Sequence, residues 1–228
     1  MHGEYTAVID VAAGIVTRTD GRVLMAERPA GKPWAGYWEF PGGKFESGET
    51  PVVALARELH EELGIELDQA YPWITRVYDY PERRVRLHMY RVFKWHGKPH
   101  GKEGQQISWE NPQAVQCEQL LPANDPILRY LCLPQIYAIT KASKYGVAAF
   151  MERLHIALEN GVRLIQVRER MVPGQLNQFA RNVVSMAHQY DAQVLINGSE
   201  NMARSTGADG VHFQTKQLMQ CEKRPNVE

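Results

Sequence analysis

Apolar residues in the first half of the chain fall in short runs separated by turn signals. Runs at 7–17 and 23–26 flank a Thr-Asp-Gly turn at 19–21, which predicts a β-hairpin. Residues 73–80 and 84–95 alternate apolar with polar positions around a Pro-Glu-Arg turn, which predicts a second hairpin. The first half is therefore expected to consist mainly of strands.

One segment between these hairpins has the period of a helix. Thr50 is the expected N-cap, Pro51 the first helical residue and Gly64 the terminator. A Gly- and aromatic-rich stretch at 31–43 precedes it, and a shorter helix is expected at 124–133. Apolar residues three and four apart form one face of the longer helix, and these are Val52, Leu55, Ala56, Leu59 and Leu63.

From residue 135 onward, strand-like runs alternate with helical stretches. The runs QIYAIT, VRLIQVR, AQVLIN and DGVHF are separated by helical patterns at 148–159, 175–189 and 200–205. This alternation predicts βαβ units and a parallel sheet, so the fold class is α/β.

The change of pattern places a domain boundary between Leu133 and Pro134, and the predicted domains are 1–133 and 134–228. Four strands are half of a closed (β/α)₈ barrel, which takes about 200 residues or more. The second domain is therefore expected to be a partial, truncated barrel.

Composition narrows the class of protein. Of 228 residues, 44% are hydrophobic and 23% are charged, which is typical of globular proteins. Lys plus Arg and Asp plus Glu both total 26, so no overall field favours a nucleic acid polymer or a membrane as partner. The three cysteines are too widely spaced for a disulfide framework or a CxxC metal site. Without a signal peptide or a long apolar run, a soluble cytoplasmic protein is expected, and nothing signals its oligomeric state.

The predicted helix carries an unusual group of carboxylates. Glu58 and Glu62 lie four residues apart, Glu61 adjoins Glu62, and Glu49 precedes the N-cap. Their mutual repulsion in water is only ~0.2–0.5 kcal/mol per pair, so a charged outer face is one explanation. The alternative is a site for a divalent cation such as Mg²⁺, which binds carboxylate oxygens and bridges them to phosphates.

This segment contains residues at a fixed spacing. Five residues separate Gly43 from Glu49, and seven more separate Glu49 from the run Arg57 to Ile65, which reads REUxEExGU with U aliphatic. The pattern Gx5Ex7REUxEExGU resembles the Nudix box at every specified position. The resemblance implies an α/β/α sandwich with a mixed sheet, in which the box forms a loop, a helix and a loop. It also implies hydrolysis of a nucleoside diphosphate linked to another group.

Residues 5–131 look most like the MutT-type 8-oxo-dGTP diphosphatases of that family. EFPGGK at 39–44, GKEGQ at 101–105 and PAND at 122–125 carry this resemblance. It implies attack of water at the β-phosphorus of 8-oxo-dGTP, which gives the monophosphate and pyrophosphate and sanitises the nucleotide pool. The implied cofactor is Mg²⁺, with Mn²⁺ as the alternative.

The same resemblance implies roles for individual residues. Arg57 would hold the carboxylates by ion pairing, and Glu103 would bind metal or orient the attacking water. Taken alone, as a residue on a Gly-rich loop, Glu103 would be explained as solvated surface. The residues implied as metal ligands are Gly42, through its carbonyl, and Glu58, Glu61, Glu62 and Glu103.

The resemblance also implies contacts with the oxidised base. Tyr80 stands where a phenylalanine is expected, and both offer an aromatic face. The side-chain amide of Asn124 can pair with a purine edge, although a helix N-cap is an alternative role. Phe40 and Tyr80 have hydrophobic packing as their alternative. The implied base-binding residues are Arg28, Phe40, Tyr80 and Asn124.

Segments 161–170 (GVRLIQVRER) and 207–213 (GADGVHF) resemble thiamine-phosphate synthases and their TenI-like relatives, from about residue 135 onward. Gln166 and Arg168 match the strand that binds phosphate and pyrimidine in that family. However, Ile196-Asn197-Gly198-Ser199 replaces the family's I-N-D-R, and His212-Phe213-Gln214-Thr215 replaces HLGQ-D. Because the metal-binding acidic residues are missing, thiamine-phosphate synthesis is not expected, and His212 is expected to be structural.

Three functions from different classes follow. The preferred one is an enzyme that hydrolyses 8-oxo-dGTP. The second is a Nudix hydrolase of a thiamine-pathway pyrophosphate or of another nucleoside diphosphate derivative. The third is a protein that binds and senses a thiamine intermediate.

Overall fold

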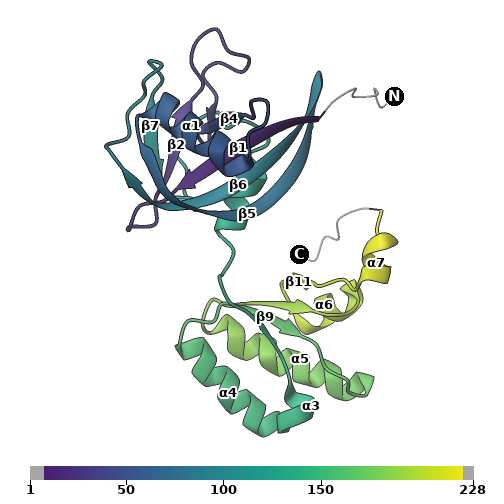
Figure 1. The fold of residues 1–228 in the computed structure, drawn as a ribbon. Coiled ribbons are helices and arrows are strands. Elements are labelled where there is room, and N and C mark those ends of the chain that lie inside the picture. The colour runs from purple at the N-terminus through teal and green to yellow at the C-terminus, as the bar shows by residue number, and fades with distance from the viewer. Residues whose placement is uncertain (1–7, 223–228) are drawn as a thin grey trace. The chain divides into compact units, whose positions relative to one another are not determined.

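The computed structural model describes residues 8–222 of the chain. By its internal contacts the chain divides into two compact units, Met1–Leu133 and Pro134–Glu228 (Figure 1). Residues 1–7 and 223–228 lie outside the described residues. They include the first residue of the first predicted strand, the start of the MutT-type resemblance and the outer ends of both predicted domains. None of the helices among the described residues has the length and apolar character needed to cross a membrane.

The first unit contains a mixed four-stranded sheet with the order β4-β1-β6-β5. β1 and β6 are parallel, whereas the other two pairs are antiparallel. The bounds of its strands are Val8–Val16 for β1, Gly42–Lys44 for β4, Glu66–Tyr80 for β5 and Arg83–His96 for β6.

The hairpin predicted from residues 7–17 and 23–26 is wrong. After β1 the chain enters a separate antiparallel sheet with the order β3-β2-β7, formed by Trp38–Glu39, Val23–Glu27 and Ile107–Glu110. A single bridge between Thr17 and Val23 joins β1 to β2. β1 instead pairs along both of its edges, and residues 12–16 are buried. This long-range pairing outweighs the local turn signal.

The second predicted hairpin is confirmed, and its strands are longer than predicted. β5 and β6 pair from Glu66–His96 to Tyr80–Arg83, with irregular register near Gln69 and Pro72. These irregularities interrupt the alternation of side chains, so the sequence pattern identified only the later part of β5. Figure 1 shows the long hairpin curving around α1.

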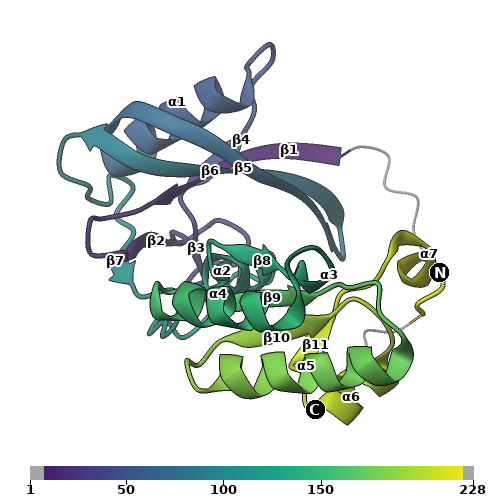
Figure 2. The same cartoon turned by 90° about the horizontal axis from the view of Figure 1, so that it is seen from below.

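Helix α1 spans Pro51–Leu63 as predicted, and Gly64 ends it in the left-handed conformation, with φ of 66°. Two details differ. Thr50 occupies the N-cap position, but its side chain makes no capping hydrogen bond. Val52 is 40% exposed, because burial of the helix on the sheet begins only at Ala54. The buried face consists of Ala54, Leu55, Leu59 and Leu63, and Figure 2 shows α1 beside the β5–β6 ribbon.

Helix α2 spans Asp125–Leu131, within the predicted range 124–133. Asn124 precedes it, but its side chain does not cap the helix, so the proposed N-cap bond is wrong. Ile127 is fully buried and belongs to the same apolar cluster as Phe40.

The second unit is a parallel β/α module, as the alternating pattern predicted. Its four strands are all parallel, in the order β11-β10-β9-β8. They are β8 (Tyr137–Ile139), β9 (Leu164–Val167), β10 (Gln193–Ile196) and β11 (Gly210–Val211). The topology is consistent with part of a (β/α)₈ barrel.

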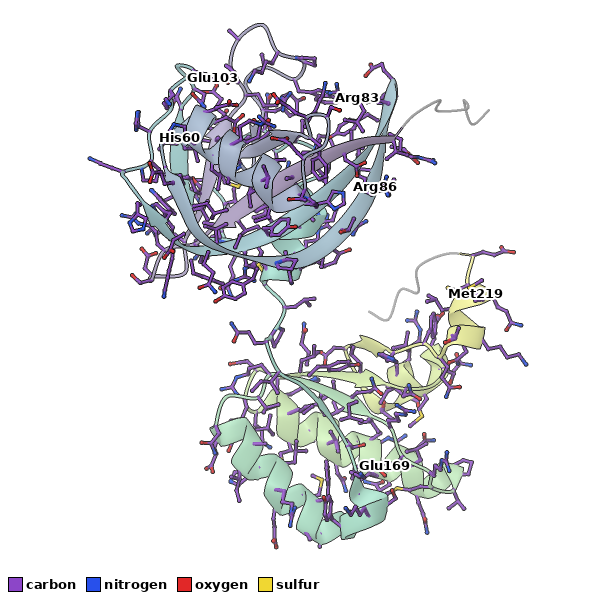
Figure 3. The ribbon with its side chains drawn as sticks, viewed as in Figure 1. His60, Arg83, Arg86, Glu103, Glu169 and Met219 are labelled. Carbon is purple, nitrogen blue, oxygen red and sulfur yellow. The ribbon has the colours of Figure 1, made fainter. Side chains whose placement is uncertain are left out.

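The three predicted helices of this unit are present, as α4 (Val147–Glu159), α5 (Pro173–His188) and α6 (Glu200–Thr206). Two short helices, α3 (Ala142–Tyr145) and α7 (Thr215–Met219), were not predicted. α4 and α5 lie against one side of the sheet in Figure 1, where Phe179 and Val183 pack in one core with Ile165 and Val194. Glu169 accepts hydrogen bonds from the backbone N–H groups of Ala142 and Ser143 at the start of α3 (Figure 3).

Candidate active site

Five of the residues implied by sequence line one pocket of the first unit. Its volume is about 410 Å³, within the ~300–1,000 Å³ of typical small-molecule sites. Side chains from the sheet, the loop after β2 and helix α1 meet there. The implied residues that line it are Arg28, Gly42, Glu58, Glu62 and Tyr80.

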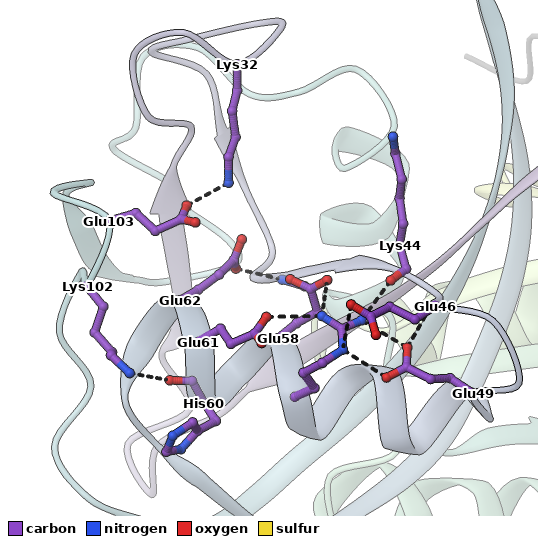
Figure 4. A network of polar contacts seen from close by, with 12 residues as sticks. Lys32, Lys44, Glu46, Glu49, Glu58, His60, Glu61, Glu62, Lys102 and Glu103 are labelled. Atoms are coloured by element: carbon purple, nitrogen blue, oxygen red, sulfur yellow. Dashed lines mark hydrogen bonds and ion pairs between the residues drawn. The ribbon is translucent and has the colours of Figure 1, made fainter.

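Arg57 organises the carboxylates of α1 from outside this pocket. Its guanidinium makes two hydrogen bonds to Glu49, at 2.8 and 2.9 Å. One further nitrogen donates to Glu58 at 2.9 Å and to Glu61 at 3.1 Å (Figure 4). Glu61 is more than half exposed, so it lies on the outer side of the cluster. A planar, always charged guanidinium can hold several carboxylates in fixed positions at once.

Glu62 is a partly buried carboxylate of the cluster with a raised pKa. Burial raises the pKa of its carboxyl to about 8, and repulsion from Glu39 and Glu58 adds to this effect. Burial also raises the pKa of Glu58, against the opposing charge of Arg57. The backbone N–H of Gly42 donates to Glu62 at 3.1 Å, which fixes the carboxylate against the start of β4.

Two consecutive glycines allow this close approach. Gly42 has φ of +147°, and a Cβ there would lie 2.1 Å from the carbonyl oxygen of Ala12. A Cβ on Gly43 would lie 2.1 Å from an oxygen of Glu58. A Cβ on Gly42 would meet fixed backbone, whereas a Cβ on Gly43 would meet the end of the Glu58 side chain, which can move. Gly42 is therefore required by packing as well as by conformation.

Phe40 and Asn124 are both buried, and neither lines the pocket directly. The side-chain oxygen of Asn124 accepts a hydrogen bond from the backbone N–H of Phe40 at 3.4 Å. This distance is long for an N–H···O bond, so the amide is held only weakly. The structure thus brings these two residues together, next to α2 rather than on the pocket surface.

Glu103 lies on the loop between β6 and β7, at the same end of the unit as Arg83 in Figure 3. Its carboxylate forms an ion pair with Lys32 at 2.6 Å. In Figure 4 this ion pair lies near Glu62.

Five charged residues line the pocket that the sequence did not imply as site residues: Glu27, Lys32, Glu39, Lys44 and Arg83. Glu39 forms an ion pair with Arg28, and burial raises its pKa even so. Arg83 lies 5.7 Å from the Tyr80 ring centroid, and its Nε is buried without a hydrogen-bond partner. The hairpin could have indicated Arg83, because it pairs with Tyr80 across the turn.

Oxygen donors of this type suit a hard divalent cation. Among residues 8–222, however, no three acidic, histidine or cysteine side chains are close enough together to hold an ion. Arg57 pairs with Glu58 and Lys32 pairs with Glu103, so two of these carboxylates already have a cation as partner. Glu62 is buried beside Glu39 and Glu58, and the charge of Lys32 only partly offsets the rise of its pKa. The donors therefore fit a divalent cation by their chemistry and by the uncompensated negative charge around Glu62.

In the second unit, Gln166 is buried and its Nε2 donates to the hydroxyl of Tyr137 at 2.8 Å. That hydroxyl lies 3.0 Å from Nδ1 of His212, which is exposed. The backbone N–H of Arg168 donates to Thr140 Oγ1 at 3.0 Å. Gln166 and His212 are thus linked through Tyr137.

Fold and site together define a class of protein: an α/β sandwich whose Gly-rich loop and helix present carboxylates to a small-molecule pocket. Residues 8–131, more than half of the chain, match the NUDIX domain family model, so the chain belongs to the Nudix family. Residues 136–227 match the thiamine monophosphate synthase family model.

Named relatives match each unit separately. The 8-oxo-dGTP diphosphatase of Haemophilus influenzae is 39% identical over 124 residues, which cover 54% of this chain and 91% of that protein. The CTP pyrophosphohydrolase of Escherichia coli is 40% identical over 121 residues, 53% of this chain and 89% of that protein. The putative thiamine-phosphate synthase 2 of Aquifex aeolicus is 41% identical over 82 residues, 36% of this chain and only 44% of that protein.

Among solved structures, the MutT NUDIX hydrolase from Burkholderia pseudomallei superposes with a TM-score of 0.50 at 25% identity. The match covers 54% of this chain and 97% of that one.

Proposed function

We propose that the first unit hydrolyses 8-oxo-dGTP to 8-oxo-dGMP and pyrophosphate, and so removes a nucleotide that mispairs during DNA replication. The observation that carries this proposal is that one pocket is lined both by the partly buried carboxylates Glu58 and Glu62 and by Tyr80 and Arg28. The similarity to 8-oxo-dGTP diphosphatases supports this substrate.

In the proposed reaction, a water oxygen bonds to the β-phosphorus. The bond from that phosphorus to the oxygen bridging to the α-phosphate breaks, and its electron pair leaves with the nucleoside monophosphate. A divalent cation held by Glu58, Glu61, Glu62, Glu103 and the carbonyl of Gly42 would neutralise phosphate charge and make the water more acidic. Arg57 keeps the carboxylates in position, since it contacts Glu49, Glu58 and Glu61. Tyr80 offers an aromatic surface for the base.

We assign hydrolysis to residues 1–133 and treat 134–228 as a separate domain. At the carboxyl end of β10 this chain has Asn197 and Gly198 in place of an acidic residue. A magnesium pyrophosphate substrate would therefore find no carboxylate there. This supports an accessory role for the second domain rather than thiamine-phosphate synthesis.

Steady-state hydrolysis tests the proposal. We expect kcat/KM to be highest for 8-oxo-dGTP, lower for dGTP, CTP and thiamine diphosphate, and abolished when Mg²⁺ is chelated. A preference for CTP would indicate the substrate named for the CTP pyrophosphohydrolase of Escherichia coli. A preference for thiamine diphosphate would favour a substrate from the thiamine pathway. Either result would overturn the assignment of 8-oxo-dGTP.

Asn124→Ala is expected to reduce selectivity for the oxidised base more than it reduces turnover. Oxidation at C8 converts N7 of guanine from an acceptor to a donor, and the amide oxygen of Asn124 can accept from it. The long bond to Phe40 is weak enough to be exchanged for that contact. The loss of one such bond corresponds to roughly tenfold in the ratio of kcat/KM values for 8-oxo-dGTP and dGTP. Equal losses for both nucleotides would contradict this role.

A further inference from the structure

Lys32 is a pocket residue whose role is not explained by the Nudix box. It lies on the loop between β2 and β3, and its ammonium group pairs with Glu103 on the loop between β6 and β7. Figure 4 shows both side chains pointing toward each other, near Glu62. A single ion pair therefore spans two separate loops at the end of the pocket where the carboxylates lie.

The two partners differ in how firmly they are held. The side-chain oxygen of Gln105 accepts from the backbone N–H of Glu103 at 2.8 Å, and its amide nitrogen donates to the carbonyl of Glu62 at 3.1 Å. Gln105 is itself buried, so the loop that carries Glu103 is attached to the end of α1. Lys32 extends from its own loop on a flexible four-carbon chain. The lysine is thus the partner that can move.

The charge of Lys32 reaches the carboxylates of the pocket. Burial raises the pKa of Glu39, Glu58 and Glu62, and the positive charge of Lys32 partly opposes this effect at each of them. Two other cations beside these carboxylates, Arg28 and Arg57, already have partners. Arg28 pairs with Glu39 and donates to the carbonyl of Pro33, whereas Arg57 holds Glu49 and Glu58.

The ion pair of Lys32 is also the easiest to exchange. The side chains of Lys32 and Glu103 are 45% and 40% exposed, and ion pairs at such exposure contribute little to stability because water solvates both partners. A polyphosphate carries several negative charges, whereas Glu103 carries one. A lysine ammonium is moreover a common phosphate ligand.

We propose that Lys32 binds the terminal phosphates of the nucleotide and that entry of the substrate moves it from Glu103 to phosphate. This exchange frees the carboxylate of Glu103 to bind a metal or to orient the attacking water once the substrate is present. The inference rests on the proposed function, because it assumes a nucleoside triphosphate in this pocket. Lys32 lies outside the Nudix box, and in this proposal it recognises the phosphate chain rather than the base.

Binding of 8-oxo-dGTP and 8-oxo-dGMP with metal chelated tests the proposal without turnover. Lys32→Met should weaken binding of the triphosphate roughly tenfold and leave the affinity for the monophosphate within about twofold. Lys32→Arg should recover most of the loss, since it keeps the positive charge. Lys98→Met removes an exposed lysine outside the pocket and should change neither affinity.

The possible outcomes separate the two proposals. If Lys32→Met leaves triphosphate affinity unchanged, or weakens both nucleotides equally, Lys32 does not bind the terminal phosphates. If kcat falls while triphosphate affinity is unchanged, Lys32 acts only by positioning Glu103, and the exchange is wrong. If the wild-type protein binds neither nucleotide, the proposed function fails and the inference fails with it.

Discussion

Glu62→Gln is expected to lower kcat about 10³-fold or more and to leave the fold intact. The amide has nearly the shape of the carboxylate but cannot supply its negative charge to a cation. Glu62 is buried beside Glu39 and Glu58, and burial disfavours its charge. Removal of that charge should therefore leave the thermal unfolding midpoint unchanged or raised. The measurements are kcat at saturating Mg²⁺ and thermal unfolding without metal.

Glu66→Gln is the matched control, because Glu66 is an exposed glutamate just after α1 and lies outside the pocket. It should change neither kcat nor the unfolding midpoint. A Glu62→Gln variant with normal kcat would refute the role of Glu62 as a metal ligand. A strong loss of stability would instead indicate that its carboxylate is structural.

Gly42→Ala is expected to destabilise the first unit by about 3 kcal/mol or more, which lowers its unfolding midpoint by on the order of 10 °C. The added Cβ would lie 2.1 Å from the carbonyl oxygen of Ala12 and 2.7 Å from Cα of Ala13. Both contacts are with backbone of β1, which pairs on its other edge with β6 and has no room to move. The measurement is thermal unfolding monitored by circular dichroism.

Gly43→Ala provides a matched comparison at the next residue. Its Cβ would meet the carboxylate of Glu58 at 2.1 Å, and the end of a side chain can rotate away. We therefore expect the fold to survive and hydrolysis to fall, because Glu58 leaves its position. If both variants unfold alike, the distinction between backbone and side-chain clash is wrong.

Local signals accounted for much of the fold. Helix α1 was predicted because Pro51 and Gly64 mark its ends and its apolar residues recur every three to four positions. The β/α alternation of the second unit was predicted for the same reason, since each element carries its own period. The carboxylates of α1 could also be grouped from spacing, because a helix places residues four apart on one flank.

Turn signals and helical periodicity could not predict contacts between segments that are distant in the sequence. The sequence by itself determined the helix, its carboxylates and the glycines that precede them, since turn chemistry and helical period act within a few residues. Only the tertiary structure decided that β1 pairs with β6 rather than β2, that Asn124 contacts Phe40 rather than capping α2, and that Lys32 meets Glu103. Each of these pairings joins residues about 70 or more positions apart. Closing so long a loop costs chain entropy, and the contacts of the rest of the fold offset that cost.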